Sequence, residues 1–228
     1  MNAESNKIRS ATEALSYIKD GMVIGLGSGT TASIFIKLVG EFIRDNRIDV
    51  IGVATSTASY DLAKNIGIPM QALEDTTDID ITFDGADEVD PELNLIKGKG
   101  GALFREKIVA LMSDRLVIMV DDSKIVHRLG EKGILPVEVI PVALNLVISS
   151  MNNLNIQHHM RMNNRQYYTT DNGNYVMDVC TEGIENTITL SEKLKSITGV
   201  IDTGLFHNLA DVVIIAYENG KVKKLQKS

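Results

Sequence analysis

Short apolar runs alternate with segments of helical periodicity through the first half of this chain. The runs fall at Met22–Ile24, Ile48–Val53, Ile79–Phe83 and Leu116–Val120. Helices are expected between them, at about Ser5–Ile18, after Gly25–Thr31 with Ile34, Leu38 and Phe42 on one face, at Thr57–Asn65 and at Gly101–Met112. Nearly continuous apolar strands are typical of a parallel sheet that helices cover on both faces. The sequence therefore predicts an α/β fold with a Rossmann-like, mostly parallel sheet.

The order of the expected strands and helices changes after Lys124. The next elements read strand, helix, strand, strand, helix, strand, at Val137–Ile140, Val142–Met151, Ile156–Met162, Tyr175–Cys180, Ile188–Ile197 and Val200–Leu205. That order is the ferredoxin-like motif, so a smaller α+β domain is expected at 130–206. A strand at Asp211–Tyr217, followed by the turn signal Asn219-Gly220, is expected to return to the first sheet. The Rossmann-like domain would then comprise residues 1–129 and 207–228.

Charge and composition exclude several classes of function. The net charge of −7 argues against a nucleic-acid partner. No apolar run approaches the roughly 18 residues of a membrane helix, so no membrane partner is expected. Cys180 is the single cysteine, which rules out an intramolecular disulfide and is compatible with the cytosol. The polar start, Met1 to Lys7, lacks the apolar core of a signal peptide, and a cytoplasmic protein is expected.

A glycine-rich turn, Gly25-Leu-Gly-Ser-Gly-Thr-Thr31, joins the first expected strand to a helix. Glycines allow a ligand to approach the backbone, and a helix N-terminus attracts a phosphate. The spacing is neither Gly-x-Gly-x-x-Gly nor a Walker A loop, so a small phosphate ester fits better than a dinucleotide or ATP. A tight turn with Ser or Thr capping explains this segment equally well.

Two further segments carry ionisable groups. Asp84-Gly-Ala-Asp-Glu-Val-Asp90 follows the third expected strand, and ligands bind at the carboxyl ends of strands in such sheets. These acids do not have EF-hand spacing, and the four histidines have no zinc-like spacing, so a required metal is disfavoured. Lys97-Gly-Lys-Gly-Gly101 could form an anion-binding nest of backbone N–H groups. Glu106 lies in the following helix, where a catalytic carboxylate and a solvent-facing one are both possible.

Lys124, after the strand Leu116–Val120, and Lys7, in the first helix, could each bind an anionic group. For both, a solvated lysine is the simpler interpretation. A site that moves protons on a small anionic substrate needs acid or base groups, a cation and exposed N–H donors, and these segments together supply all three.

In this order and spacing, the motifs resemble ribose-5-phosphate isomerase of the A type. The resemblance includes Gly25-Leu-Gly-Ser-Gly-Thr-Thr-Ala, Asp84-Gly-Ala-Asp-Glu and Lys97-Gly-x-Gly-Gly-Ala-Leu-x-Arg-Glu-Lys-Ile. It continues through Asp122-Ser-Lys124, Leu135-Pro-Val-Glu-Val-Ile-Pro141, Thr170-Asp-Asn-Gly-Asn174 and Gly204-Leu-Phe206. It implies interconversion of D-ribose 5-phosphate and D-ribulose 5-phosphate in the non-oxidative pentose phosphate pathway, without cofactor or metal, by a homodimer or homotetramer.

The resemblance also implies residue roles. Glu106 would move a proton between C1 and C2 through an enediolate, Asp84 would assist ring opening, and Lys97 would stabilise the enediolate oxygen. The implied substrate-binding residues are Lys7, Ser28, Gly29, Thr30, Thr31, Asp84, Gly85, Ala86, Asp87, Lys97, Gly98, Lys99, Gly100 and Lys124. Asp87 would contact substrate hydroxyls.

Lys99 departs from the family pattern, which generally has glycine there. If the backbone at this position required positive φ, a lysine would cost about 1 kcal/mol or more.

Two other functions compete with the isomerase. An amino-sugar phosphate deaminase or a lactonase-like hydrolase would be expected to place a histidine in these loops, and none falls there. A non-catalytic sugar-phosphate sensor would want a DNA-binding segment, and would have no need of Glu106.

Overall fold

The computed structural model describes residues 3–227 and divides into two compact units. The first unit comprises 1–86, 105–125 and 208–228, and the second 87–104 and 126–207. Residues 87–104 therefore group with the second unit, whereas the sequence assigned them to the first. The physical reason is a three-stranded sheet in the order β14 (Leu205–Phe206), β6 (Leu95–Ile96), β5 (Glu88–Val89).

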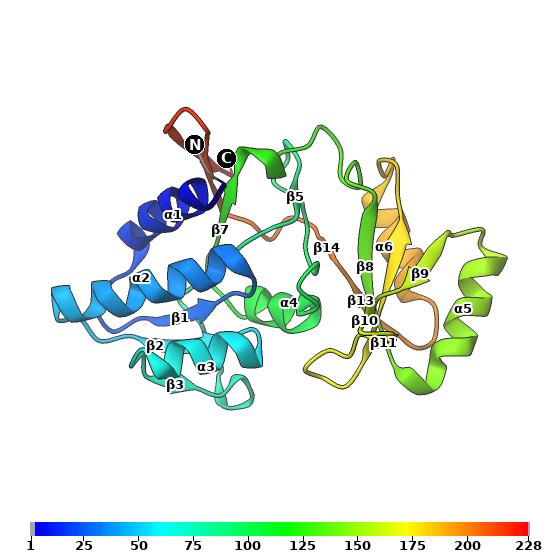
Figure 1. Cartoon of the computed structure of the whole chain (residues 1–228), viewed down its shortest axis with the longest axis horizontal. Coiled ribbons are helices and arrows are strands. Elements are labelled where there is room, and N and C mark those ends of the chain that lie inside the picture. The colour runs from blue at the N-terminus through cyan, green and yellow to red at the C-terminus, as the bar shows by residue number, and fades with distance from the viewer. Residues whose placement is uncertain (1–2, 228) are drawn as a thin grey trace. The chain divides into compact units, whose positions relative to one another are not determined.

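The first unit contains a seven-stranded sheet (Figure 1). Its order is β16 (Val222–Gln226), β15 (Val212–Ala216), β7 (Leu116–Asp121), β4 (Ile81–Asp84), β1 (Val23–Leu26), β2 (Ile51–Ala54), β3 (Met70–Gln71). Every neighbouring pair is parallel except β15 and β16, which form the expected hairpin. The strand order reverses direction between β1 and β4, which is where doubly wound sheets bind ligands. The predicted Rossmann-like fold is confirmed.

Helices cover both faces of this sheet. They are α1 (Ala3–Ala14), α2 (Thr30–Asn46), α3 (Thr57–Asn65) and α4 (Leu103–Leu111). Helix α4 belongs to this unit from Arg105 onward. Short 3-10 turns lie at Leu15–Tyr17, Leu73–Asp75 and Asp122–Lys124. Figure 1 shows α1 and α2 lying over the sheet, and they contact each other. Along β4, Phe83 faces the core under α1 and α2 and stacks on Phe35 at 4.5 Å between ring centroids. Val109 of α4 packs on the opposite face with Val53.

The helix faces differ in part from the expected ones. In α2 the fully buried residues are Ala32, Phe35, Ile36, Val39 and Gly40, while Ile34, Leu38 and Phe42 are only partly buried. Small residues at this interface let the helix approach its neighbours closely: a Cβ on Gly40 would lie 3.0 Å from Ile66 Cδ1. A prediction from hydrophobic periodicity gives little weight to glycine and alanine positions of this kind. Ile8, an apolar residue of α1, is 44% exposed.

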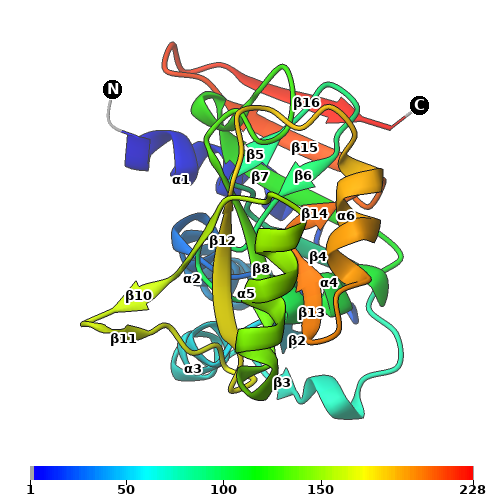
Figure 2. The same cartoon turned by 90° about the vertical axis from the view of Figure 1, so that its right-hand side faces the viewer.

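The second unit is built around a four-stranded antiparallel sheet (Figure 2). Its order is β13 (Val200–Thr203), β8 (Ile134–Val139), β12 (Tyr175–Cys180), β9 (His158–Met160). The helices α5 (Leu144–Asn153) and α6 (Thr187–Lys195) lie on one side of it, with a 3-10 turn at Pro141–Ala143. Their side chains Val147 and Leu194 share a core with Val137 and Met177 of the sheet. This arrangement confirms the predicted ferredoxin-like unit.

A two-stranded hairpin, β10 (Met162–Asn163) and β11 (Gln166–Tyr167), extends from the second unit (Figure 2). Sequence periodicity had predicted one strand over Ile156–Met162. Strand β9 instead ends at Met160, and after one further backbone hydrogen bond, from Arg161 N–H to Val176 O at 2.9 Å, the chain continues into the hairpin. Arg161, between the two strands, and Tyr168, after the hairpin, both face the glycine-rich loop described below.

Candidate active site

Asp84 is the last residue of β4, and its carboxylate is built into the turn after β1. Asp84 Oδ1 accepts hydrogen bonds from the backbone N–H groups of Ser28 (3.1 Å) and Gly85 (2.7 Å). A Cβ on Gly27 would lie 2.1 Å from that oxygen, so only glycine leaves room for the carboxylate. Asp84 is 1% exposed. The structure thus brings together two of the predicted segments, the glycine-rich turn and the acidic segment.

Thr30 and Thr31, the last residues of this glycine-rich segment, are the first residues of α2. Gly29 precedes them with φ 89° and ψ −176°, a conformation almost restricted to glycine. Gly29 has no side chain that could cap the helix, so the first N–H groups of α2 point toward the turn and can receive an anion. Lys7 Nζ donates to Thr30 Oγ1 at 2.8 Å, which places this lysine at the turn rather than on a remote solvated face.

Two residues that sequence reasoning missed brace the turn from α3 and the end of β2. Thr55 Oγ1 lies 2.7 Å from Ser28 Oγ, and Ser59 Oγ donates to the carbonyl of Gly27 at 2.7 Å. Thr55 directly follows β2, the parallel neighbour of β1. Its place at a strand carboxyl end was the signal that could have identified it.

Other predicted residues of the first unit lie at the same sheet edge. Because β1, β4 and β7 are parallel neighbours, their carboxyl ends bring Ser28, Asp84 and Lys124 to one side. Lys124 ends the 3-10 turn after β7, and Asp121 Oδ1 caps this turn through the N–H of Ser123 at 3.0 Å. Gly85 is close to Thr31, since a Cβ added to it would be 3.9 Å from Thr31 Cβ. Ala86 is the last residue before the second unit.

In the second unit, Lys97 opens the glycine-rich loop and is 3% exposed. Its N–H donates to Gly204 O at 2.9 Å, and its ammonium lies 5.6 Å from the centroid of the Phe206 ring. A buried lysine over an aromatic face keeps its positive charge in a fixed place. This position suits a cation that must meet a developing negative charge.

Asp87 belongs to the second unit together with this loop. Its Oδ2 accepts the N–H of Lys99 at 2.9 Å, and the N–H of Gly101 donates to Gly98 O at 2.9 Å. Gly98 and Gly101 have φ values of 102° and 81°. The loop is therefore a tight turn in which the glycines occupy the positions that need left-handed backbone.

Lys99 is exposed and is not among the residues with positive φ. The backbone strain considered for lysine at this position is therefore absent from the loop, and its chain conformation is one that any residue adopts. The departure from the family pattern leaves the loop geometry intact.

Lys99→Gly is expected to lower stability slightly, because glycine gains conformational freedom in the unfolded chain without relieving any strain. The expected cost is about 0.5–1 kcal/mol, or roughly 1–4 °C in Tm for a chain of this length. Thermal unfolding measures this change, and the turnover measured in a steady-state assay should stay near that of wild type. A collapse of turnover would contradict this and reveal a role for the Lys99 ammonium.

Glu106 lies in the first turn of α4, which begins at Leu103 directly after the loop. Its side chain is buried, with 5% exposure, so the solvent-facing alternative is wrong. Glutamate is seldom buried to this degree without a specific role. The positive end of the helix dipole lies at this first turn.

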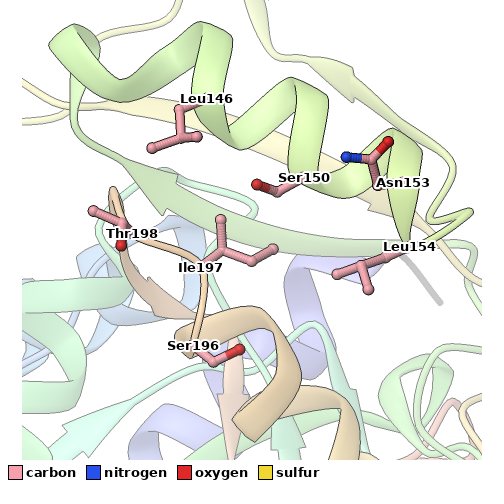
Figure 3. A pocket seen from close by; sticks show the side chains of 7 residues that line it. All are labelled: Leu146, Ser150, Asn153, Leu154, Ser196, Ile197 and Thr198. Atoms are coloured by element: carbon pink, nitrogen blue, oxygen red, sulfur yellow. The ribbon is translucent and has the colours of Figure 1, made fainter.

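A pocket of the second unit offers no comparable chemistry. This pocket of about 400 Å³, between α5 and the segment that follows α6, is lined by Leu146, Ser150, Asn153, Leu154, Ser196, Ile197 and Thr198 (Figure 3). None of these side chains carries a charge with which to hold a phosphate. Within residues 3–227, no three His, Cys, Asp or Glu side chains gather as a metal site. No helix in that range is long and apolar enough to cross a membrane.

Comparison with known proteins identifies the family. The family model for ribose 5-phosphate isomerase A (phosphoriboisomerase A) matches residues 51–220. The chain is 42% identical over 230 residues to ribose-5-phosphate isomerase A of Pyrococcus horikoshii, covering 100% of both chains. It is 41% identical to that of Listeria monocytogenes, covering 94% of this chain and 96% of the relative.

Solved structures of related proteins support the same family. A D-ribose-5-phosphate isomerase in complex with phospho-erythronic acid superposes with a TM-score of 0.95 at 41% identity, and the match covers 100% of both chains. Ribose 5-phosphate isomerase from Plasmodium falciparum superposes with a TM-score of 0.95 at 36% identity over 99% of both chains. Sequence and fold thus lead to one assignment: the chain belongs to the ribose 5-phosphate isomerase A family.

Proposed function

We propose that this protein interconverts D-ribose 5-phosphate and D-ribulose 5-phosphate by metal-free proton transfer through an enediolate. The observation that carries the mechanism is the burial of Glu106 in the first turn of α4, immediately after a loop of N–H donors and a buried lysine. A carboxylate base and an oxyanion site are the two groups that this reaction needs.

In the forward direction Glu106 removes the proton from C2 of the open-chain aldose. The electrons of the C2–H bond form the C1=C2 double bond, and those of the C1 carbonyl move onto O1, giving the enediolate. Glu106, now a carboxylic acid, returns its proton to C1. The hydroxyl proton on O2 is lost as the C2 carbonyl forms, and O1 is protonated. A positioned base contributes about 10²–10⁴-fold to such a step.

Lys97 and the N–H groups of Gly98 and Gly100 are proposed to stabilise the negative charge on the enediolate oxygen. Preorganised donors act most strongly on charge that develops during the reaction. Asp87 is proposed to contact substrate hydroxyls, and one of its oxygens already orients the loop through Lys99 N–H.

Asp84 is proposed to assist opening of the furanose ring. Its Oδ1 is held by Ser28 and Gly85 N–H groups, which fixes the orientation of the carboxylate. Ser28, Gly29, Thr30, Thr31, Gly85, Ala86, Lys124 and Lys7 are proposed to bind the substrate around it, with Lys7 already bonded to Thr30. Fixing the ends of the sugar phosphate supplies binding energy that positions C1 and C2 for reaction.

The ligand of the related solved enzyme, phospho-erythronic acid, supports a sugar-phosphate substrate. It is a phosphorylated sugar acid, and its planar carboxylate carries negative charge on oxygen as an enediolate does. The family likeness also supports a place in the non-oxidative pentose phosphate pathway, a cytoplasmic location and a homodimer or homotetramer.

The test is conversion of ribose 5-phosphate by the purified protein with and without EDTA, with boiled protein as the blank. Turnover that EDTA leaves unchanged is expected, because the proposed proton transfer needs only side chains and backbone donors. Activity that EDTA removes and added metal restores would keep the substrate and contradict the metal-free mechanism. No conversion by a protein with intact circular dichroism would contradict the isomerase itself.

A further inference from the structure

Two side chains that stand in none of the sequence motifs, Arg161 and Tyr168, bind carbonyl oxygens of the glycine-rich loop. Arg161 Nη1 donates to the carbonyl oxygens of Gly98 (2.8 Å) and Lys99 (2.9 Å). Tyr168 donates its hydroxyl proton to Gly100 O at 3.1 Å. Three successive carbonyls of the loop are thus bound by side chains of the second unit.

Arg161 is itself braced. Its Nε donates to Asp178 Oδ2 at 3.0 Å, and its Nη2 pairs with Asp178 Oδ1. The two side chains are 15% and 7% exposed, so the pair is largely removed from water. A bidentate guanidinium–carboxylate pair has a fixed plane, which a lysine could not reproduce. Asp178 sits in the middle of β12, a rigid strand of the four-stranded sheet.

Tyr168 is tied to the same cluster. Its N–H donates to Arg161 O at 2.8 Å, and the Arg161 guanidinium lies 5.9 Å from the centroid of its ring. The ring packs on Gly101 so closely that a Cβ there would lie 2.4 Å from Tyr168 Cε1. Burial, followed by the charge of Asp171, raises the pKa of the Tyr168 phenol above its usual value. The hydroxyl therefore stays protonated and can donate to Gly100 O throughout the neutral range.

Binding these carbonyls fixes the opposite edge of the loop. In a planar trans peptide the C=O of one residue and the N–H of the next point in opposite directions. Arg161 on Lys99 O therefore turns the N–H of Gly100 away from Arg161. Tyr168 on Gly100 O fixes the next peptide, whose N–H closes the turn onto Gly98 O. Donors held in this way need no reorganisation when charge develops, which is the basis of oxyanion stabilisation.

We propose that Arg161, braced by Asp178, and Tyr168 are positioning residues that hold the loop Lys97–Gly101 so that the N–H of Gly100 is directed at the enediolate oxygen. This inference rests on the proposed isomerase function. Asp178 neutralises the charge of Arg161, so Arg161 acts through the geometry of its fork rather than through its charge. None of the three residues is assigned any contact with the substrate.

The decisive experiment compares kcat and KM for ribose 5-phosphate in Arg161→Met, Arg161→Lys and Tyr168→Phe with wild type. Loss of a whole oxyanion donor costs about 10²–10³ in kcat, and a loosened donor should lose part of that, so Arg161→Met is expected to lower kcat roughly 10–100-fold. KM should change little, because the donors act on charge that exists only after proton abstraction. Arg161→Lys should remain impaired because it keeps the charge and loses the fork. Tyr168→Phe should lose severalfold in kcat.

The matched control is Arg165→Met, which removes the same charge from an exposed position in the turn of the hairpin β10–β11. It should keep wild-type kcat and KM. Circular dichroism and Tm establish whether each variant is folded. If Arg161→Met is unfolded, the kinetics of Tyr168→Phe test the inference instead, because this variant removes only one hydroxyl.

Wild-type kcat in the folded variants would overturn the inference, and so would a raised KM with unchanged kcat. Full activity in Arg161→Lys would contradict the role proposed for the forked guanidinium group of Arg161. Because wild type is assayed alongside, failure of the isomerase proposal is distinguishable: it would appear as no conversion by wild type.

Discussion

Glu106→Gln is expected to lower kcat for ribose 5-phosphate isomerisation by about 10²–10⁴-fold, the usual contribution of a positioned base. Glutamine matches glutamate in shape and hydrogen-bonding length, but it cannot accept a proton from carbon at neutral pH. The side chain is buried in the first turn of α4, so the amide should fit the same space. KM should stay near that of wild type, since the groups proposed to bind the sugar phosphate are unchanged.

The control for this variant is Glu192→Gln, which makes the same chemical change at an exposed position of α6. Its kcat, KM and Tm should all match wild type. Exchange of the C2 proton with deuterated solvent gives a second readout, because a variant without the base should show neither turnover nor exchange. Near-normal turnover in folded Glu106→Gln would remove Glu106 from the mechanism.

Gly27→Ala is the second change with a large expected effect. The new Cβ would lie 2.1 Å from Asp84 Oδ1 and 2.7 Å from Asp84 Cα, and a backbone atom cannot move away cheaply. Overpacking of this kind costs about 1–3 kcal/mol or more, which is roughly 2–12 °C in Tm for a chain of this length. Turnover should fall as well, because the turn that orients Asp84 and Ser28 must shift.

Gly100→Ala provides the stability control for Gly27→Ala. Gly100 has no positive φ, and a Cβ there would meet no atom within 4 Å among the described residues. Thermal unfolding of the two variants should differ accordingly, with Gly100→Ala close to wild type. Equal Tm values for the two variants would show that the β1–α2 turn relaxes without cost, contrary to the geometry.

Much of the fold could be predicted from periodicity and turn chemistry. The bounds of α3 at Thr57–Asn65 and of β12 at Tyr175–Cys180 coincide with the predicted ones. The ferredoxin-like order was readable because each of its elements is long enough to show a period. Strands β5, β6 and β14 are only two residues each and show no period. Their pairing joins residues 87–104 to the second unit and depends on contacts such as Ile96 with Leu205, far apart in the sequence.

The candidate site divides in the same way. Asp84 and Lys97 could be proposed from the sequence because each stands in a local motif beside glycines or a strand end, whereas the role of Glu106 was implied only by the family resemblance. Arg161 and Tyr168 stand in no motif, and they reach the loop only because β9, β12 and the hairpin bring them there. Thr55 had a weak signal in its place after β2.

The sequence by itself determined which residues are proposed to carry the chemistry, because glycine spacing, an acid after a buried strand and a lysine before a loop are local patterns. Only the tertiary structure decided the environment of those residues. It placed Glu106 out of water, put Lys99 in an unstrained conformation and bound three loop carbonyls to Arg161 and Tyr168. The physical reason is that burial and hydrogen-bond direction arise from contacts between distant segments, which no local pattern encodes.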